Sequence, residues 1–230
     1  ADDNLDHDDT DLRALVNVVL SAAELAGIPK NPSPWLTPLP ATLTLDHFVG
    51  QRLPSGSVIL GLEDLPDDQR QAPRLWHVAD DSPLLIAGGA RSGRTTAMRS
   101  ILLQLIQRFT PQDLHLYAID YGNGALLPFS TAPHTGAVVP GLDNARITRL
   151  LDRILKELTR RQNVLSTAGV SSISEQRANA ATPEERLPQI VLAIDGWERA
   201  SATMGADEMT ALRDSIMRIV REGPSAGVAL

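Results

Sequence analysis

The chain has 230 residues, enough for one domain with an extension or for two small domains. It carries 28 acidic and 21 basic residues, a formal net charge of −7, and this balance argues against the basic face that duplex nucleic acid usually requires. The chain has no cysteine, which excludes disulfides and thiolate sites, and no apolar run long enough to span a membrane, so a soluble intracellular protein is expected.

The first 30 residues are expected to form an acidic tail followed by one amphipathic helix. Residues 1–9 are acidic, and from Thr10 onward apolar residues recur at helical spacing. Gly27 and Pro29 then provide a stop signal. We expect this helix to dock on another element or to connect domains.

Residues 31–80 are expected to form a proline-rich linker followed by short extended segments. Four prolines lie within residues 31–40, and each proline fixes its own φ and biases the preceding residue toward extended structure. A semi-rigid linker is the favoured interpretation, and a ligand for a proline-recognising domain is the alternative. Residues 57–61 are the clearest extended piece.

Residues 81–230 alternate apolar strands with amphipathic helices. The expected strands cover residues 84–87, 114–120 and 190–195, and the expected helices cover residues 95–109, 147–165 and 209–220. Apolar strands without alternation, separated by helices, predict an α/β fold with a mostly parallel sheet covered by helices. Because residues 227–230 read as the opening of a further strand, we expect this core to be truncated at its C-terminal end.

The loop after the first of these strands has the spacing of a phosphate-binding P-loop. The run Gly88-Gly89-Ala90-Arg91-Ser92-Gly93-Arg94-Thr95 fits G-x-x-x-x-G-K-[ST], except that arginine replaces lysine. The glycines allow turns that aim backbone N–H groups at phosphates, and the following helix adds its positive end. We therefore expect these residues and Thr96 to bind ATP, with the Thr95 hydroxyl on Mg²⁺; a glycine-rich turn without a ligand is the alternative.

Arg94 is the first residue that differs from the P-loop sequence of a hydrolysing ATPase, which has lysine at this position. Lysine is a compact charge on a flexible stem, whereas guanidinium is broad and planar. Arg94 therefore favours phosphate binding more than the geometry of γ-phosphoryl transfer.

The apolar run Gln189–Asp195 is typical of a Walker B strand, whose final carboxylate would hold the water shell of Mg²⁺. A capping aspartate after a buried strand is the alternative. The position after Asp195 is Gly196, so the glutamate that activates water in many such ATPases is absent. Glu198 could substitute for it, but on a continuing strand it would point elsewhere, so a surface role is favoured.

Asp120 ends the middle strand at the same expected sheet edge, where open α/β folds bind ligands. It could line the nucleotide site or shape the turn after the strand, and the sequence leaves both open. A structural role is favoured for His134. Several arginines on the 147–165 helix are expected to form a solvated or interface face, with no arginine finger located: Arg146, Arg149, Arg153, Arg160 and Arg161.

Taken together, these segments resemble the FtsK/SpoIIIE family over roughly residues 50–230. The matching parts are the P-loop at 84–96, the second strand and its loop at 116–126, the turn Pro133-His134, the arginine-ending helix up to Arg161, and the Walker B strand at 190–195. The proline-rich linker further resembles the one before a second or third ATPase module in EccC-type proteins of type VII secretion.

The resemblance implies a RecA-like P-loop core, ATP and Mg²⁺ binding, and sister modules in a hexamer-like ring. It also implies a cytoplasmic module held at the inner face of the membrane by other parts of the full-length protein. The cargo would be a small helical export substrate of the WXG100 class, recognised through its C-terminal signal. An active DNA translocase module of the same family is the alternative, disfavoured by the acidic charge.

Overall fold

The computed structural model describes residues 10–29 and 35–230; the expected acidic tail at 1–9 and part of the proline-rich linker lie outside the described residues. The chain divides into two units, Ala1–Leu39 with Asp64–Gln71, and Pro40–Glu63 with Ala72–Leu230. The first unit contains helix α1 (Asp11–Leu25), whose N-terminus is capped by the Thr10 hydroxyl, which accepts a 3.3 Å hydrogen bond from the Arg13 N–H. Among the described residues, no helix combines the length and apolarity needed to cross a membrane.

Strands β1 (Ser57–Leu65) and β2 (Arg70–His77) form a two-stranded sheet, where only short extended segments were expected. Its buried end lies in the second unit and is joined to helix α2 (Arg94–Arg108) by one side-chain amide. The Gln104 amide donates to the Ile59 carbonyl and accepts from the Ile59 N–H, both at 2.8 Å. The Gln104 amide thereby satisfies both backbone hydrogen-bonding groups of Ile59, as a neighbouring strand would.

The second unit is built on a four-stranded sheet in the order β4-β3-β5-β6, and all of its pairings are parallel. The strands are β3 (Leu114–Asp120), β4 (Thr135–Pro140), β5 (Gln189–Asp195) and β6 (Val228–Ala229). Strands β3 and β5 pair over their whole length, from Leu114 opposite Gln189 to Asp120 opposite Asp195. The expected α/β fold with a parallel sheet is confirmed.

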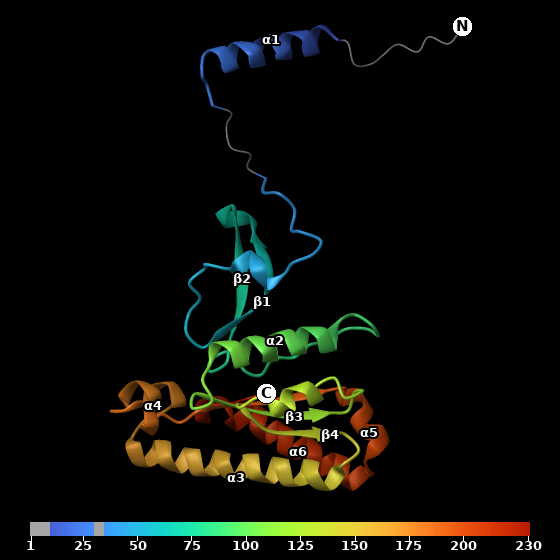
Figure 1. Ribbon diagram of the computed structural model, residues 1–230, viewed down its shortest axis with the longest axis vertical. Helices are drawn as coiled ribbons and strands as arrows, with labels where there is room; N and C mark the ends of the chain where they lie inside the picture. The colour runs from blue at the N-terminus through green and yellow to red at the C-terminus, as the bar shows by residue number, and fades with distance from the viewer. Residues whose placement is uncertain (1–9, 30–34) are drawn as a thin grey trace, which may run out of the picture. The chain divides into compact units, whose positions relative to one another are not determined.

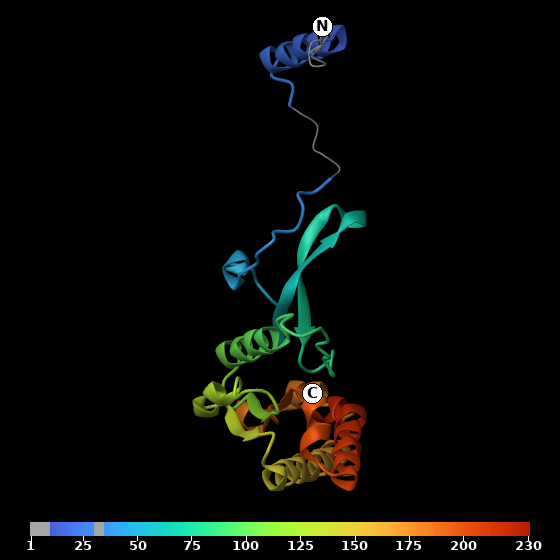
Figure 2. The same cartoon turned by 90° about the vertical axis from the view of Figure 1, so that its right-hand side faces the viewer.

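Helices cover both faces of this sheet, with α2 on one face and α3 (Asn144–Ala168) and α6 (Ala206–Glu222) on the other (Figures 1 and 2). Two apolar cores follow from this arrangement, because successive strand residues point to opposite faces. Leu116 of β3 packs in the α2 core, whereas Ile119 packs in the α3–α6 core. The remaining short helices are α4 (Ile173–Asn179), α5 (Ala200–Thr203), η1 (Leu45–Phe48), η2 (Pro66–Asp68), η3 (Leu127–Thr131), η4 (Pro183–Glu185), η5 (Trp197–Arg199) and η6 (Pro224–Ala226).

The expected strand at 84–87 is wrong as a regular strand. This segment has no strand assignment, and its backbone makes one hydrogen bond to the end of the chain, from the Leu84 N–H to the Leu230 carbonyl at 2.8 Å. The physical reason is the length of its neighbour, because β6 has two residues and this one bond is the backbone pairing that the described residues show beside it.

Arg161 departs from the expectation that the arginines of α3 form a solvated or interface face. Its side chain is 1% exposed. It donates to the Ala226 carbonyl at 3.1 Å, to the Gly227 carbonyl at 3.3 Å, and to a Glu157 oxygen at 2.9 Å. Arg161 therefore ties α3 to the turn that leads into β6, and Glu157 balances the buried charge.

The substitution Glu157→Gln should lower the free energy of unfolding by about 3 kcal/mol, because a buried guanidinium loses its counter-charge. The Arg160 and Arg161 guanidinium groups lower the pKa of Glu157 from 4.5 to about 2. The ionised carboxylate therefore stabilises the fold fully above pH 4.5, and this stabilisation is lost as the pH falls toward 2.

Urea unfolding measured from neutral pH down into the acid range reports both effects, and the Glu157→Gln variant should show the weaker acid dependence. Arg160→Gln is the control, because that side chain is 54% exposed and its loss should cost at most about 1 kcal/mol. Equal destabilisation by the two substitutions would contradict the assignment.

Candidate functional site

The candidate site lies where β3 and β5 end beside the N-terminus of α2. The parallel register places Asp120 and Asp195 opposite each other at this edge. Their carboxylates converge on Gly122, since a Cβ built on Gly122 would lie 3.0 Å from an oxygen of each. The sequence predicted that both aspartates end neighbouring strands at one edge, and the structure brings them together there.

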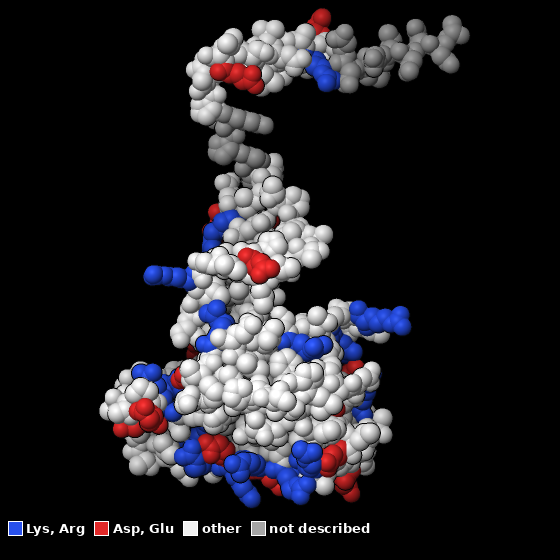
Figure 3. Space-filling view, in the orientation of Figure 1, with Lys and Arg blue, Asp and Glu red and all other residues white. Residues whose placement is uncertain are grey.

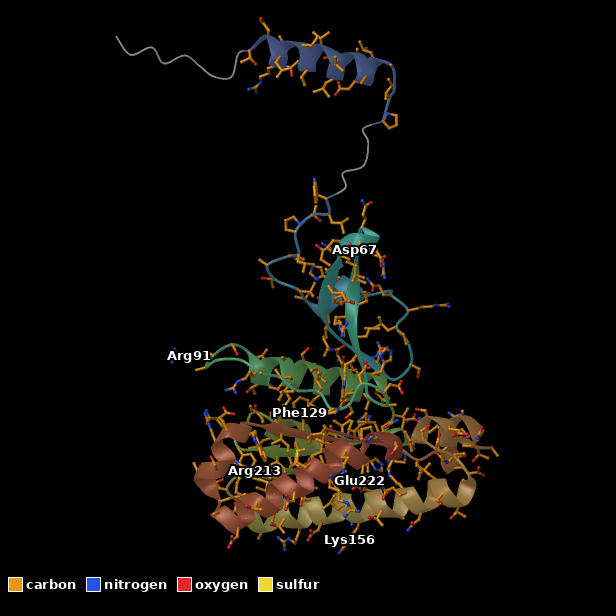
Figure 4. All side chains as sticks on the ribbon, turned by 180° about the vertical axis from the view of Figure 1, so that it is seen from behind. Asp67, Arg91, Phe129, Lys156, Arg213 and Glu222 are labelled. Atoms are coloured by element: carbon orange, nitrogen blue, oxygen red, sulfur yellow. The ribbon has the colours of Figure 1, made fainter. Side chains whose placement is uncertain are left out.

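The expected P-loop residues form an exposed loop that turns into α2. Gly93 caps this helix with φ +90°, a left-handed conformation that favours glycine. The N–H groups of Gly93, Arg94 and Thr95 make no hydrogen bond within the described structure, as expected for the first turn of a helix. Arg91, with φ +61°, lies at the tip of the loop (Figure 4). The loop therefore offers unpaired donors at the positive end of α2, which is the arrangement that binds phosphates.

Close packing at the base of the loop explains one of its glycines. A Cβ on Gly88 would come within 2.4 Å of the Ser92 hydroxyl, whereas Gly89 has open space around it. A side chain at position 88 would therefore require the Ser92 side chain to move. Ala90 and Thr96 belong to the same loop and the same first helical turn, and both are exposed.

Thr95 and Asp195 are in direct contact although they are a hundred positions apart in sequence. The Thr95 hydroxyl lies 3.1 Å from one Asp195 oxygen and 3.0 Å from the other. Asp195 is 8% exposed, so its carboxylate is held in place with a hydroxyl beside it. A hydroxyl and a carboxylate are the hard oxygen ligands that Mg²⁺ accepts, together with water and phosphate, and the pair fits a Mg²⁺ site of that kind.

Glu198 does not point away from the site. Strand β5 ends at Asp195, Gly196 turns the chain with φ +73°, and η5 returns the next residues toward α2. The Glu198 carboxylate accepts a 2.9 Å hydrogen bond from Nη2 of Arg94. The hydrogen bond from its own backbone N–H, followed by that from Arg94, lowers the pKa of Glu198 below its ordinary value. The missed signal was Gly196 itself, because a left-handed glycine ends a strand.

The backbone at position 196 disfavours any side chain there, including a glutamate. Besides the positive φ, a Cβ at this position would lie 3.1 Å from both the Gly122 nitrogen and the Tyr121 carbonyl carbon. These are backbone atoms and cannot swing aside. A side chain at position 196 therefore requires the loop after β3 to move.

Asp120 has both carboxylate oxygens engaged by backbone N–H groups. One accepts from Gly122 at 2.8 Å and the other from Leu126 at 2.9 Å. These bonds support the turn-shaping interpretation of Asp120, and its contact with a nucleotide stays a prediction. His134 is buried as well, and its Nε2–H donates to the Phe109 carbonyl at 2.8 Å, which ties β4 to the end of α2.

An apolar cavity of about 290 Å³ adjoins the site. Its walls include Leu84–Ile86, Met98, and the β5 residues Val191–Ile194. β6 pairs with β5 only at Ile190 and Val191, which leaves the rest of that β5 edge without a strand beside it among the described residues. Arg94, Asp195 and Glu198 also line this cavity, so it borders the phosphate loop.

Comparison with known proteins agrees with this geometry. The family model described as "FtsK/SpoIIIE family" matches residues 62–228. The ESX secretion system protein YukB of Bacillus subtilis is 32% identical over 227 residues, which cover 95% of this chain and 14% of YukB. The chain therefore spans about one seventh of the length of that relative.

Solved structures give the same result. EssC (ATPases 2 and 3) from Geobacillus thermodenitrificans superposes with a TM-score of 0.71 at 28% identity, over 84% of this chain and 35% of that one. Thermomonospora curvata EccC (ATPases 2 and 3), in complex with a signal sequence peptide, gives a TM-score of 0.64 at 27% identity, over 76% and 31%. From the parallel sheet, the loop at 88–95 and the matched residues, the chain belongs to the FtsK/SpoIIIE family.

Proposed function

We propose that this chain is an ATP- and Mg²⁺-binding module of a type VII secretion motor, and that it hydrolyses ATP slowly or not at all. The observation that carries the proposal is the contact between the Thr95 hydroxyl and the Asp195 carboxylate beside unpaired N–H groups at the start of α2. The loop from Gly88 to Thr96 holds the phosphates. Thr95 and Asp195 would hold Mg²⁺ through the hydroxyl and the carboxylate, and the ion would supply positive charge against the phosphates.

Two features support weak hydrolysis. Arg94 stands where an active loop has lysine, and its guanidinium is engaged by Glu198 at 2.9 Å. Gly196 stands where a glutamate would activate water, and its left-handed backbone is packed against the loop after β3. The chain thus has groups to bind a nucleotide triphosphate and no carboxylate directly after Asp195 to deprotonate water.

The secretion role is supported by the relatives, since YukB is named an ESX secretion system protein. On this proposal the chain works beside sister modules in a hexamer-like ring, on the cytoplasmic side of a membrane that other parts of the protein reach. One similar structure holds a signal sequence peptide. We extend this to a cargo of small helical WXG100-type proteins recognised by their C-terminal signals.

DNA is the less favoured cargo. In the face drawn in Figure 3, basic side chains gather over α3 but acidic ones lie between them, so no unbroken basic stripe follows that helix. A phosphate backbone is normally tracked by a continuous basic surface. The net charge of −7 adds to this argument.

The wild-type chain should bind MgATP while its turnover stays well below about 1 s⁻¹, the low end for ordinary enzymes. Arg94→Lys should leave turnover low, because the water-activating glutamate is still absent. Calorimetric ATP titration and a phosphate-release assay measure the two properties. Fast turnover by the wild-type chain would refute the degenerate assignment, and strong salt-dependent binding to duplex DNA would favour the translocase.

Thr95→Ala should weaken the Mg²⁺-dependent part of ATP binding by about tenfold or more, because the metal loses an oriented ligand. Binding measured in EDTA should change much less. Titration with a fluorescent ATP analogue, with and without Mg²⁺, gives both numbers. Thr210→Ala on the exposed face of α6 is the matched control, and an equal effect of the two substitutions would contradict the Mg²⁺ assignment.

Gly196→Ala should destabilise the chain by about 1–3 kcal/mol, from left-handed strain and from the close backbone atoms. Gly169→Ala is the matched control, because Gly169 has φ +68° but nothing within 4 Å of its Cβ position. It should therefore pay only the conformational cost. Urea unfolding compares the two, and a smaller loss at position 196 than at 169 would show that the loop after β3 yields easily.

A further inference from the structure

We propose that Glu198 sets the nucleotide affinity of this site by holding Arg94, so that ATP binds only by displacing the carboxylate from the guanidinium. The inference rests on the proposed ATP binding and goes further, because it assigns a positioning role to a residue outside the loop and outside the Walker B aspartate. Glu198 hydrogen-bonds to Arg94, and this bond determines whether the Arg94 guanidinium can contact a phosphate.

The geometry places the two residues in competition with phosphate. Arg94 is the first residue of α2 and occupies the loop position whose cation reaches the β- and γ-phosphates. Its Nη2 instead donates to Glu198 at 2.9 Å. The Glu198 carboxylate is therefore the anion beside Arg94 at the N-terminus of α2. A bound phosphate would occupy the same position, because helix N-termini attract anions.

Among the cations near the loop, only Arg94 is paired with Glu198 in the described structure. Arg199, the next cation along η5, donates to the side chain of Asn123 at 3.2 Å. Arg91 lies at the tip of the loop, on the far side of the turn from α2 (Figure 4). Neither of the two lysines of the chain, Lys30 and Lys156, belongs to the loop. The phosphates therefore compete with Glu198 for the Arg94 side chain.

The expected size of the effect follows from exposure. The Arg94 side chain is 36% exposed and that of Glu198 is 52% exposed, so water screens the pair. Exposed pairs of this kind are weak, and releasing one should tighten ATP binding by roughly two- to fivefold. AMP, which lacks β- and γ-phosphates, should bind equally well before and after release.

The test measures MgATP and AMP affinity, by calorimetry at one fixed salt concentration, for the wild-type chain, Glu198→Gln and Glu198→Asp. Glu198→Gln removes the charge, whereas Glu198→Asp keeps the charge and shortens the side chain by one methylene, which breaks the 2.9 Å contact. Both should tighten MgATP binding and leave AMP binding unchanged. Glu222→Gln, which also removes an arginine-paired carboxylate but lies on α6 (labelled in Figure 4), should change neither.

The outcomes separate the two proposals. If the wild-type chain binds MgATP but Glu198→Asp does not bind it more tightly, the role of Glu198 is overturned. Tighter binding by Glu198→Gln alone would then reflect only the loss of repulsion between the carboxylate and the phosphates. Weaker binding by either Glu198 variant overturns it as well. If no variant and no wild-type chain binds MgATP, the proposed function fails, and the role of Glu198 fails with it.

Discussion

The pairing between β3 and β5 is the constraint on which the site depends. Both strands have seven residues, they pair along their whole length in parallel, and they end together at Asp120 and Asp195. A shift of one residue would send the core residues of a strand to the opposite face and separate the two carboxylates. The buried apolar residues on both faces therefore fix the position of Asp195, and with it the contact to Thr95.

The turn after β5 shows how one backbone conformation determines several side-chain positions. Gly196 adopts a left-handed φ, the strand stops, and η5 brings Glu198 back to the start of α2. The same conformation removes space for a side chain at position 196. The tight space at position 196 and the contact between Glu198 and Arg94 thus both follow from this one turn.

Much of the fold follows from sequence pattern, because its strands and helices are strongly periodic or continuously apolar. The helices α2, α3 and α6 and the strands β3 and β5 lie within a few residues of their expected ranges. Strand β4 was not predicted, since Thr135–Pro140 is short, begins directly after a turn and contains a glycine and a proline. The segment at 84–87 was predicted as a strand from its composition, but strand formation needs a partner, and sequence pattern does not reveal the partner's length. Motif spacing identified the loop and Asp195, because it reflects local backbone geometry, but it could not place Glu198 or the buried Arg161, whose partners are fixed by tertiary packing over tens of residues.

The packing around Gly196 also bears on how such a site changes over evolutionary time. A single substitution that restored a glutamate at position 196 would place its Cβ 3.1 Å from backbone atoms of Tyr121 and Gly122, in a left-handed conformation. Tyr121 and Gly122 would first have to move, and they lie in the turn that Asp120 holds with both carboxylate oxygens. On the proposed function, a return to hydrolysis would then need a compensating change in this turn as well as the new carboxylate, so two substitutions would have to be selected together.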